Sequence, residues 1–177
     1  MALRGLHHTG IIVRNLDRSV YFYHDLLGLE FASEPSPWFS GDELATGVGV
    51  PDASLRQVNL RLGDDIVELL EYGNRPGDNQ SVPPQNRLGS MHVAFRVDDI
   101  AQTMRVLGAK GITFLSDANV VDEGTLAGWR WVYFHDPDGI TIELVEEAYT
   151  TPHEEAITAY LRSRRPLEHF VAAGELA

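Results

Sequence analysis

Cysteine is absent from the 177-residue chain. This excludes a disulfide framework and thiolate-bound metal, so histidine, aspartate and glutamate would have to hold any metal ion. Long apolar runs are also missing, since no stretch approaches the roughly 18 residues that a membrane span needs. We therefore expect a soluble, cytoplasmic protein that has no membrane partner.

Basic residues are scarce as well. The chain has 14 Lys and Arg against 26 Asp and Glu, which gives a formal net charge of -12. Such a charge repels nucleic-acid phosphates, and the short group at Arg162, Arg164 and Arg165 is too small to offset it. We expect no nucleic-acid partner.

What the sequence does contain is an internal repeat. The segment "HTGIIVRNLDRS" begins at His8, and "HVAFRVDDIAQT" begins at His92, 84 residues later. In both copies strand-like residues lead into a helical stretch, which ends at a glycine before an apolar return ("LGLEF" and "KGITF"). Each copy then closes on a similar strand, "GDDIVELLEY" in the first and "PDGITIELVEE" in the second. The pattern predicts two βαβββ modules.

The repeat sets the expected domain boundaries. We predict an α+β fold with one domain over residues 1–147, made of module one (5–73), a linker (74–88) and module two (89–147). The linker is rich in Gly, Pro, Asn and Ser. Residues 148–177 lie outside the repeat, and we expect them to form a helical tail with Thr151 as its N-cap and Pro152 at its first position.

Strand alternation places one metal-competent side chain on the same face of each of four strands. Side chains of a strand point alternately to its two faces, and the apolar residues here occupy one face. The opposite face carries His8, Glu68, His92 and Glu143. Singly, such residues are more often structural or solvated than ligands. Together, at equivalent positions of a duplicated unit, they predict a divalent metal site, because a cation neutralises two carboxylates that are costly to bury unpaired.

At these residues the chain resembles the vicinal oxygen chelate superfamily, which includes glyoxalase I, methylmalonyl-CoA epimerase, extradiol dioxygenases, and fosfomycin and bleomycin resistance proteins. The resemblance covers Leu6 to Glu147, with "HHTGIIVRNLDRSVYFYHDLLGLEF", "IVELLEY", "MHVAFRV" and "HDPDGITIELVEE" as its most specific parts. It implies that the two modules form a cup-shaped mixed sheet around the metal. It favours His8 over His7 as a ligand, and the ligand set is closest to that of glyoxalase I.

The resemblance also implies a chemistry. Ligands of this type suit Zn, Ni, Co, Mn or Fe, and an open metal stabilises the enediolate formed when a vicinally oxygenated substrate loses a proton. We thus expect a metal-dependent isomerase or lyase with Glu143 as the first choice of catalytic base and Glu68 as the second. The expected substrate-binding residues are Ile12, Leu70, Tyr72, Arg96 and Trp131. Tyr72 stands where glyoxalase I has an asparagine, a departure from its glutathione-binding pattern.

Two other functions are compatible with the sequence. An Fe(II)-dependent ring-cleaving dioxygenase would use His8, His92 and Glu143 alone. A metal-free binding protein would sequester a drug or metabolite, as bleomycin resistance proteins do. A homodimer is expected in the isomerase and binding readings, because an open cup leaves sheet edges to cover.

Overall fold

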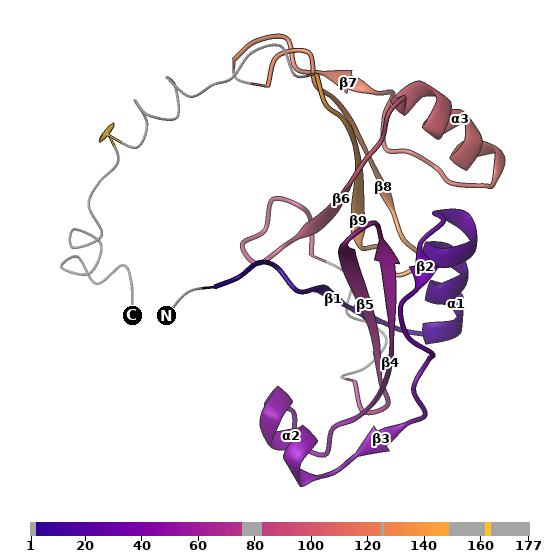
Figure 1. The fold of residues 1–177 in the computed structure, drawn as a ribbon, viewed down its shortest axis with the longest axis vertical. Coiled ribbons are helices and arrows are strands. Elements are labelled where there is room, and N and C mark those ends of the chain that lie inside the picture. The colour runs from indigo at the N-terminus through magenta and orange to yellow at the C-terminus, as the bar shows by residue number, and fades with distance from the viewer. Residues whose placement is uncertain (1–2, 76–82, 125, 149–161, 164–177) are drawn as a thin grey trace.

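A computed structural model describes residues 3–75, 83–124, 126–148 and 162–163. The fold is α+β, as predicted, and it is built as two copies of one βαβββ topology (Figure 1). The expected helical tail lies outside the described residues except at positions 148, 162 and 163. In the described part of the chain, no helix combines the length and apolar character needed to cross a membrane.

Module one forms a sheet in the order β1-β5-β4-β2, with β3 added on β4. Strand β1 runs parallel to β5, and β4 runs antiparallel to both β5 and β2. The elements are β1 (Thr9–Val13), helix α1 (Leu16–Val20) continuing as the π-helical segment η1 (Tyr21–Leu26), β2 (Glu30–Phe31), β3 (Phe39–Ser40), α2 (Asp42–Val48), β4 (Ser54–Leu62) and β5 (Asp65–Tyr72). Strand β3 and helix α2 are an insertion relative to module two.

Module two repeats this order as β6-β9-β8-β7. Strand β6 is parallel to β9, and β8 is antiparallel to both β9 and β7. Its elements are β6 (His92–Arg96), α3 (Ile100–Ala109), β7 (Asn119–Val120), β8 (Arg130–His135) and β9 (Thr141–Glu146). The mixed sheet is thus present as two hydrogen-bonded sheets, one in each module.

The local signals explain where the helices begin and end. Asn15 caps α1 by accepting from the Arg18 backbone N–H at 2.8 Å, and Asp99 caps α3 through the Gln102 N–H at 2.8 Å. Gly28, with φ of +87°, ends the first helix in the left-handed region that glycine adopts without strain. Gly111 follows α3 with φ of +97°, so the shared helix, glycine and strand pattern has the same physical cause in both modules.

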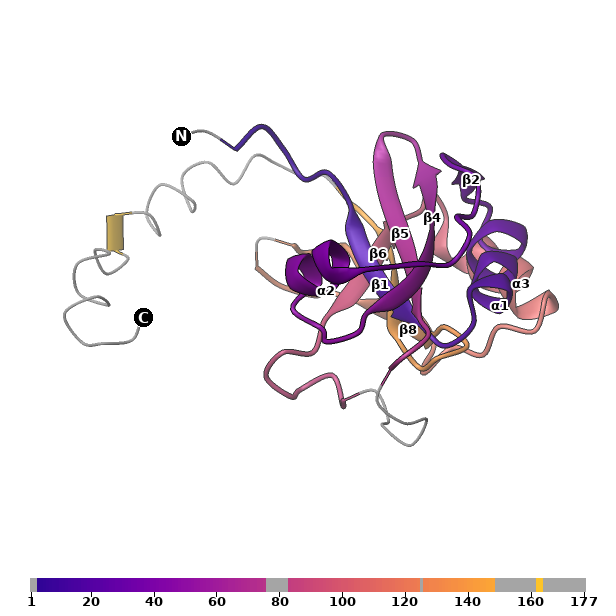
Figure 2. The ribbon, with the colours of Figure 1, turned by 90° about the horizontal axis from the view of Figure 1, so that it is seen from below.

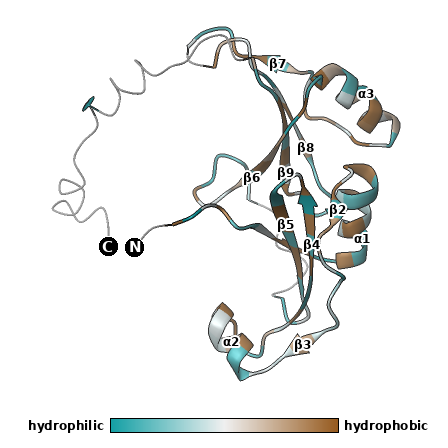
Figure 3. Ribbon diagram, in the orientation of Figure 1, coloured by the Kyte–Doolittle hydropathy of each residue, from teal (hydrophilic) through white to brown (hydrophobic). Residues whose placement is uncertain are grey.

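The core lies between the helices and one face of both sheets. Helices α1 and α3 lie side by side, next to the two sheets, in both ribbon views (Figures 1 and 2). Hydrophobic and hydrophilic residues both occur along the strands (Figure 3), as alternation requires. The fully buried side chains include Leu69, Val132 and Ile142, while their strand neighbours Glu68 and Glu143 lie on the other face.

Charged and phenolic groups join the two modules. The turn Asp136–Gly139, which leads into β9, contacts module one. Asp136 accepts from the buried Tyr23 hydroxyl at 3.1 Å. Asp138 accepts from the Arg14 backbone N–H at 2.9 Å and pairs with the Arg18 guanidinium. The turn therefore anchors the first helix of module one on module two.

Candidate metal centre

The first half of the candidate site lies where β1 begins beside β5. His8 Nε2 is 3.3 Å from Glu68 Oε2, and Gly10 is the residue of β1 that pairs with Glu68. A Cβ at position 10 would lie 3.7 Å from this carboxylate oxygen. The Glu68 carboxylate therefore lies beside the backbone of Gly10, at a distance that would also accommodate a small side chain.

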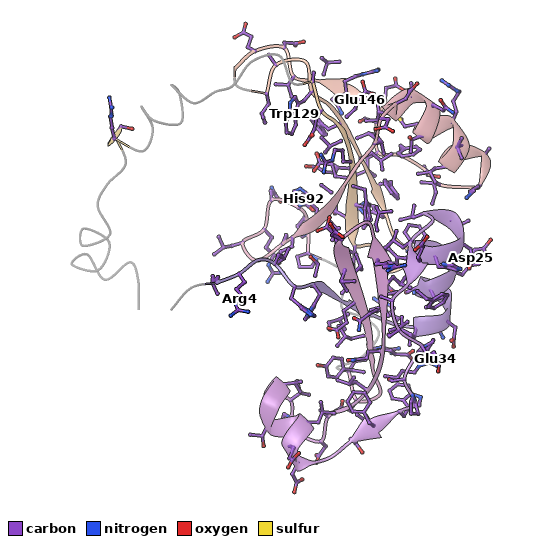
Figure 4. The ribbon with its side chains drawn as sticks, in the orientation of Figure 1. Arg4, Asp25, Glu34, His92, Trp129 and Glu146 are labelled. Carbon is purple, nitrogen blue, oxygen red and sulfur yellow. The ribbon has the colours of Figure 1, made fainter. Side chains whose placement is uncertain are left out.

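The second half repeats this arrangement in module two. His92 Nε2 is 3.1 Å from Glu143 Oε2, and Ala94 of β6 pairs with Glu143 of β9. His92 lies on β6, on the side opposite α1 and α3 (Figure 4). Each module thus carries one histidine and one glutamate at equivalent positions of the same parallel strand pair. The repeat predicted this equivalence.

The carboxylates are more buried than the imidazoles. The side chains of Glu68 and Glu143 are 16% and 13% exposed, against 41% and 37% for His8 and His92. Burial raises the pKa of Glu143, and the neighbouring His92 partly offsets this by stabilising the charged form. Each carboxylate is therefore held at the inner end of its pair with the imidazole nearer the solvent.

Each pair has the geometry of two neighbouring ligands. Metal–nitrogen and metal–oxygen bonds of roughly 2.0–2.2 Å place adjacent donor atoms about 3 Å apart, which matches the 3.3 and 3.1 Å separations. A hydrogen bond between an imidazole and a carboxylate has about the same separation, so each pair is compatible with metal binding by two neighbouring ligands. In the part of the chain that the structure describes, no three His, Asp or Glu side chains stand close enough together to hold one ion. Convergence of all four stays a prediction.

The two histidines face a common cavity of about 660 Å³. It lies between the start of β1, the β4–β5 turn and β6, and both modules contribute to its wall. Arg96 also lines it and approaches Glu147 at 3.5 Å, so the predicted substrate-binding arginine has an acidic neighbour. None of the other four predicted substrate-binding residues lines this cavity; all are described in the structure, namely Ile12, Leu70, Tyr72 and Trp131.

Both the sequence and the fold of the chain match known proteins. Residues 5–144 match the model of the Glyoxalase/Bleomycin resistance protein/Dioxygenase superfamily. The chain belongs to this superfamily. A glyoxalase family protein from Bacillus cereus has the same fold, with a TM-score of 0.68 and 23% identity over 83% of this chain and 96% of its own.

Two curated relatives of this superfamily member are named as enzymes. The 2-epi-5-epi-valiolone epimerase of Actinomyces sp is 32% identical over 153 residues, which is 85% of this chain and 83% of the relative. The lactoylglutathione lyase of Schizosaccharomyces pombe is 28% identical over 165 residues, or 86% of this chain and 50% of the relative. These relatives support an isomerase or lyase function of the glyoxalase type.

The aromatic residues of β8 divide as alternation predicts. Tyr133 pairs with Glu143 across the ladder, and its ring meets His92 edge-on with centroids 5.4 Å apart. Trp131 lies on the same face as Tyr133, and the centroids of their rings are 5.2 Å apart. Phe134 is fully buried in the core. Burial and the Glu143 charge raise the pKa of Tyr133. The sequence alone did not single out Tyr133, which the β8–β9 register places against the second half-site of this glyoxalase-superfamily chain.

Proposed function

We propose that the protein is a divalent-metal-dependent epimerase or isomerase of the glyoxalase type. The observation that carries this is the repeated His–Glu pair, 3.3 Å apart in module one and 3.1 Å apart in module two. His8, Glu68, His92 and Glu143 would hold the ion. Glu68 is paired with a histidine in the same way as Glu143, which favours two equivalent half-sites over the three-ligand set of a ring-cleaving dioxygenase.

The proposed chemistry is proton transfer beside a carbonyl. A divalent metal supplies Lewis-acid polarisation of the substrate carbonyl, which acidifies the neighbouring C–H. Glu143 would accept the proton from this carbon, and Glu68, which comes from the other module and takes up a proton from solvent beforehand, would deliver that proton to the opposite face. Solvent would then remove the proton from Glu143. The carbon is inverted and no other bond changes. Burial raises the pKa of Glu143, a direction that makes a carboxylate a stronger base.

A small polyhydroxy ketone is the substrate class we propose. The support is the 32% identical relative, which is named for the epimerisation of 2-epi-5-epi-valiolone. A glutathione adduct is the competing class, because a second relative is a lactoylglutathione lyase. Tyr72 lies on the same face of β5 as Glu68, four residues later, and puts a phenol where glyoxalase I has an asparagine. This favours the ketone.

Solvent exchange tests the proposal. The metal-loaded protein is incubated in D2O with 2-epi-5-epi-valiolone, or separately with the hemithioacetal of methylglyoxal and glutathione, and proton NMR follows deuterium entering the carbon next to the carbonyl. We expect exchange and epimerisation of the ketone, with a loss of at least about 100-fold in Glu143→Gln because one general base contributes 10²–10⁴-fold. Glu30→Gln, on the exposed strand β2, is the matched control. Full turnover in both Glu68→Gln and Glu143→Gln would contradict the proposal.

We also propose that the protein is a homodimer. Apolar side chains at and near the cavity rim are exposed, including Leu6 at 85% and Met91 at 76%. A second copy of the chain would remove this surface from water. Sedimentation velocity should give about twice the 19.7 kDa chain mass, and Leu6→Asp should shift the protein toward monomer.

A further inference from the structure

Each histidine of the candidate centre has a second hydrogen-bond partner on its other ring nitrogen. His8 Nδ1 lies 2.8 Å from His7 Nδ1, and His92 Nδ1 lies 2.9 Å from Gln85 Nε2. The other nitrogen of each ring, Nε2, is the one directed at a glutamate. The two half-sites thus share a three-residue chain: a local polar partner, a histidine and a glutamate.

The hydrogen-bond partners of His8 and His92 come from different parts of the chain, so the repeat alone does not explain why both histidines have one. His7 directly precedes its histidine in the chain, whereas Met91 stands at the corresponding place in module two. There the linker supplies the partner instead. Its turn is closed by Arg87 N–H and Ser90 Oγ, which both donate to the Pro84 carbonyl, at 2.9 and 2.8 Å. This turn holds Gln85 against His92.

The chemistry of imidazole explains what such partners do. A neutral histidine that binds a metal through Nε2 must carry its proton on Nδ1, and this N–H needs an acceptor that fixes the ring orientation. The Gln85 amide nitrogen can donate to Nδ1 when His92 carries its proton on Nε2, on the side of Glu143. Turning the amide by half a rotation presents its oxygen to an Nδ1–H. The imidazole of His7 has the same ability, since its Nδ1 donates in one tautomer and accepts in the other.

We propose that His7 and Gln85 are positioning residues that hold His8 and His92 with Nε2 directed at the metal. His7 also lines the cavity, but the role proposed for both residues is exerted through the histidines that they contact. The inference rests on the proposed function, because it assumes that these histidines are ligands. It assigns a role to both histidines of the "HH" pair, one as ligand and the other as its orienting partner.

Metal affinity is the first test. Zn2+ dissociation constants are measured on the full chain by competition with a chromophoric chelator. Loss of an outer partner of a metal-bound histidine weakens binding about 10–100-fold. We expect this loss in Gln85→Leu and in His7→Leu, which remove the hydrogen bond. Gln85→Glu and His7→Asn keep an acceptor and should bind close to the wild-type affinity. Gln102→Leu, the same change at an exposed position of α3, is the matched control.

A second readout separates positioning from a structural role. Nitrogen-15 NMR of the imidazole rings in the zinc-loaded protein reports the tautomer of each histidine. We expect Nδ1–H with Nε2 bound to zinc for His8 and His92 in the wild type, and a mixed population at His92 in Gln85→Leu.

The outcomes separate the two proposals. Equal zinc affinity in the wild type and in both Leu variants overturns the positioning role and leaves the metal centre standing. A wild-type chain that takes up no zinc, nickel, cobalt, manganese or iron overturns the proposed function and the positioning role together. Weaker binding in Gln85→Leu that Gln85→Glu does not restore also overturns the role, because the acceptor is then not what matters.

Discussion

The hydrogen bond between Tyr23 and Asp136 gives a sharp test of how the modules are joined. Tyr23 is fully buried, and its hydroxyl donates to Asp136 Oδ2 at 3.1 Å across 113 residues of chain. Tyr23→Phe removes only this hydroxyl and keeps the ring in the core. A hydrogen bond to a charged group contributes about 1.5–3 kcal/mol, so we expect the free energy of unfolding to fall by about that amount. In urea, with a slope of about 2 kcal/mol/M, the midpoint should drop by roughly 1 M.

The loss should depend on pH in a defined direction. Burial raises the pKa of Asp136 above its usual value of 3.8, while the Tyr23 hydrogen bond lowers it. A carboxyl group with a raised pKa stabilises the fold most when protonated, and that stability is lost as the pH rises through the raised pKa. Without the Tyr23 hydroxyl the pKa rises further. The variant should therefore differ least from the wild type below pH 3.8 and most above the raised pKa of Asp136.

Tyr21→Phe is the matched control, because Tyr21 is exposed two residues earlier in the same helix. It should change the unfolding free energy by less than about 0.5 kcal/mol. The measurement is urea unfolding followed by circular dichroism between pH 3 and pH 8. If Tyr23→Phe loses no more than Tyr21→Phe at pH 7, the module contact does not stabilise the fold as argued.

Three further predictions concern a buried ion pair, a glycine with positive φ and the metal. Glu71 accepts from the Leu16 backbone N–H at 2.7 Å and pairs with Arg56 at 2.8 Å, so Glu71→Gln should lower the unfolding free energy by about 1–3 kcal/mol. Glu146→Gln, the equivalent change in module two, should lower the unfolding free energy by less in the same urea assay. The reason is that Arg130, the arginine that pairs with Glu146, lies 3.9 Å away. Gly28→Ala forces a side chain into φ of +87° and should lower the thermal midpoint through a loss of about 1 kcal/mol. Dialysis against EDTA should abolish deuterium exchange into the substrate, and one equivalent of divalent metal should restore it; exchange that survives metal removal would refute metal dependence.

Much of the fold was readable from the sequence because its signals are local. The duplication at His8 and His92 and the period of two along the strands depend only on neighbouring residues. They predicted the βαβββ modules, and they put Glu68 and Glu143 on the face opposite Leu69 and Ile142, as the structure shows.

Only the tertiary structure decided which segments far apart in the chain contact each other. No local pattern indicates that Asp136 meets Tyr23 or that Gln85 of the linker meets His92. The sequence also could not show that the four candidate ligands stand as two pairs, because strand periodicity reports which face a side chain is on and not how two modules are oriented. The face of each side chain was therefore set by the sequence itself, while its partner across the modules depended on packing, which is a property of the whole chain.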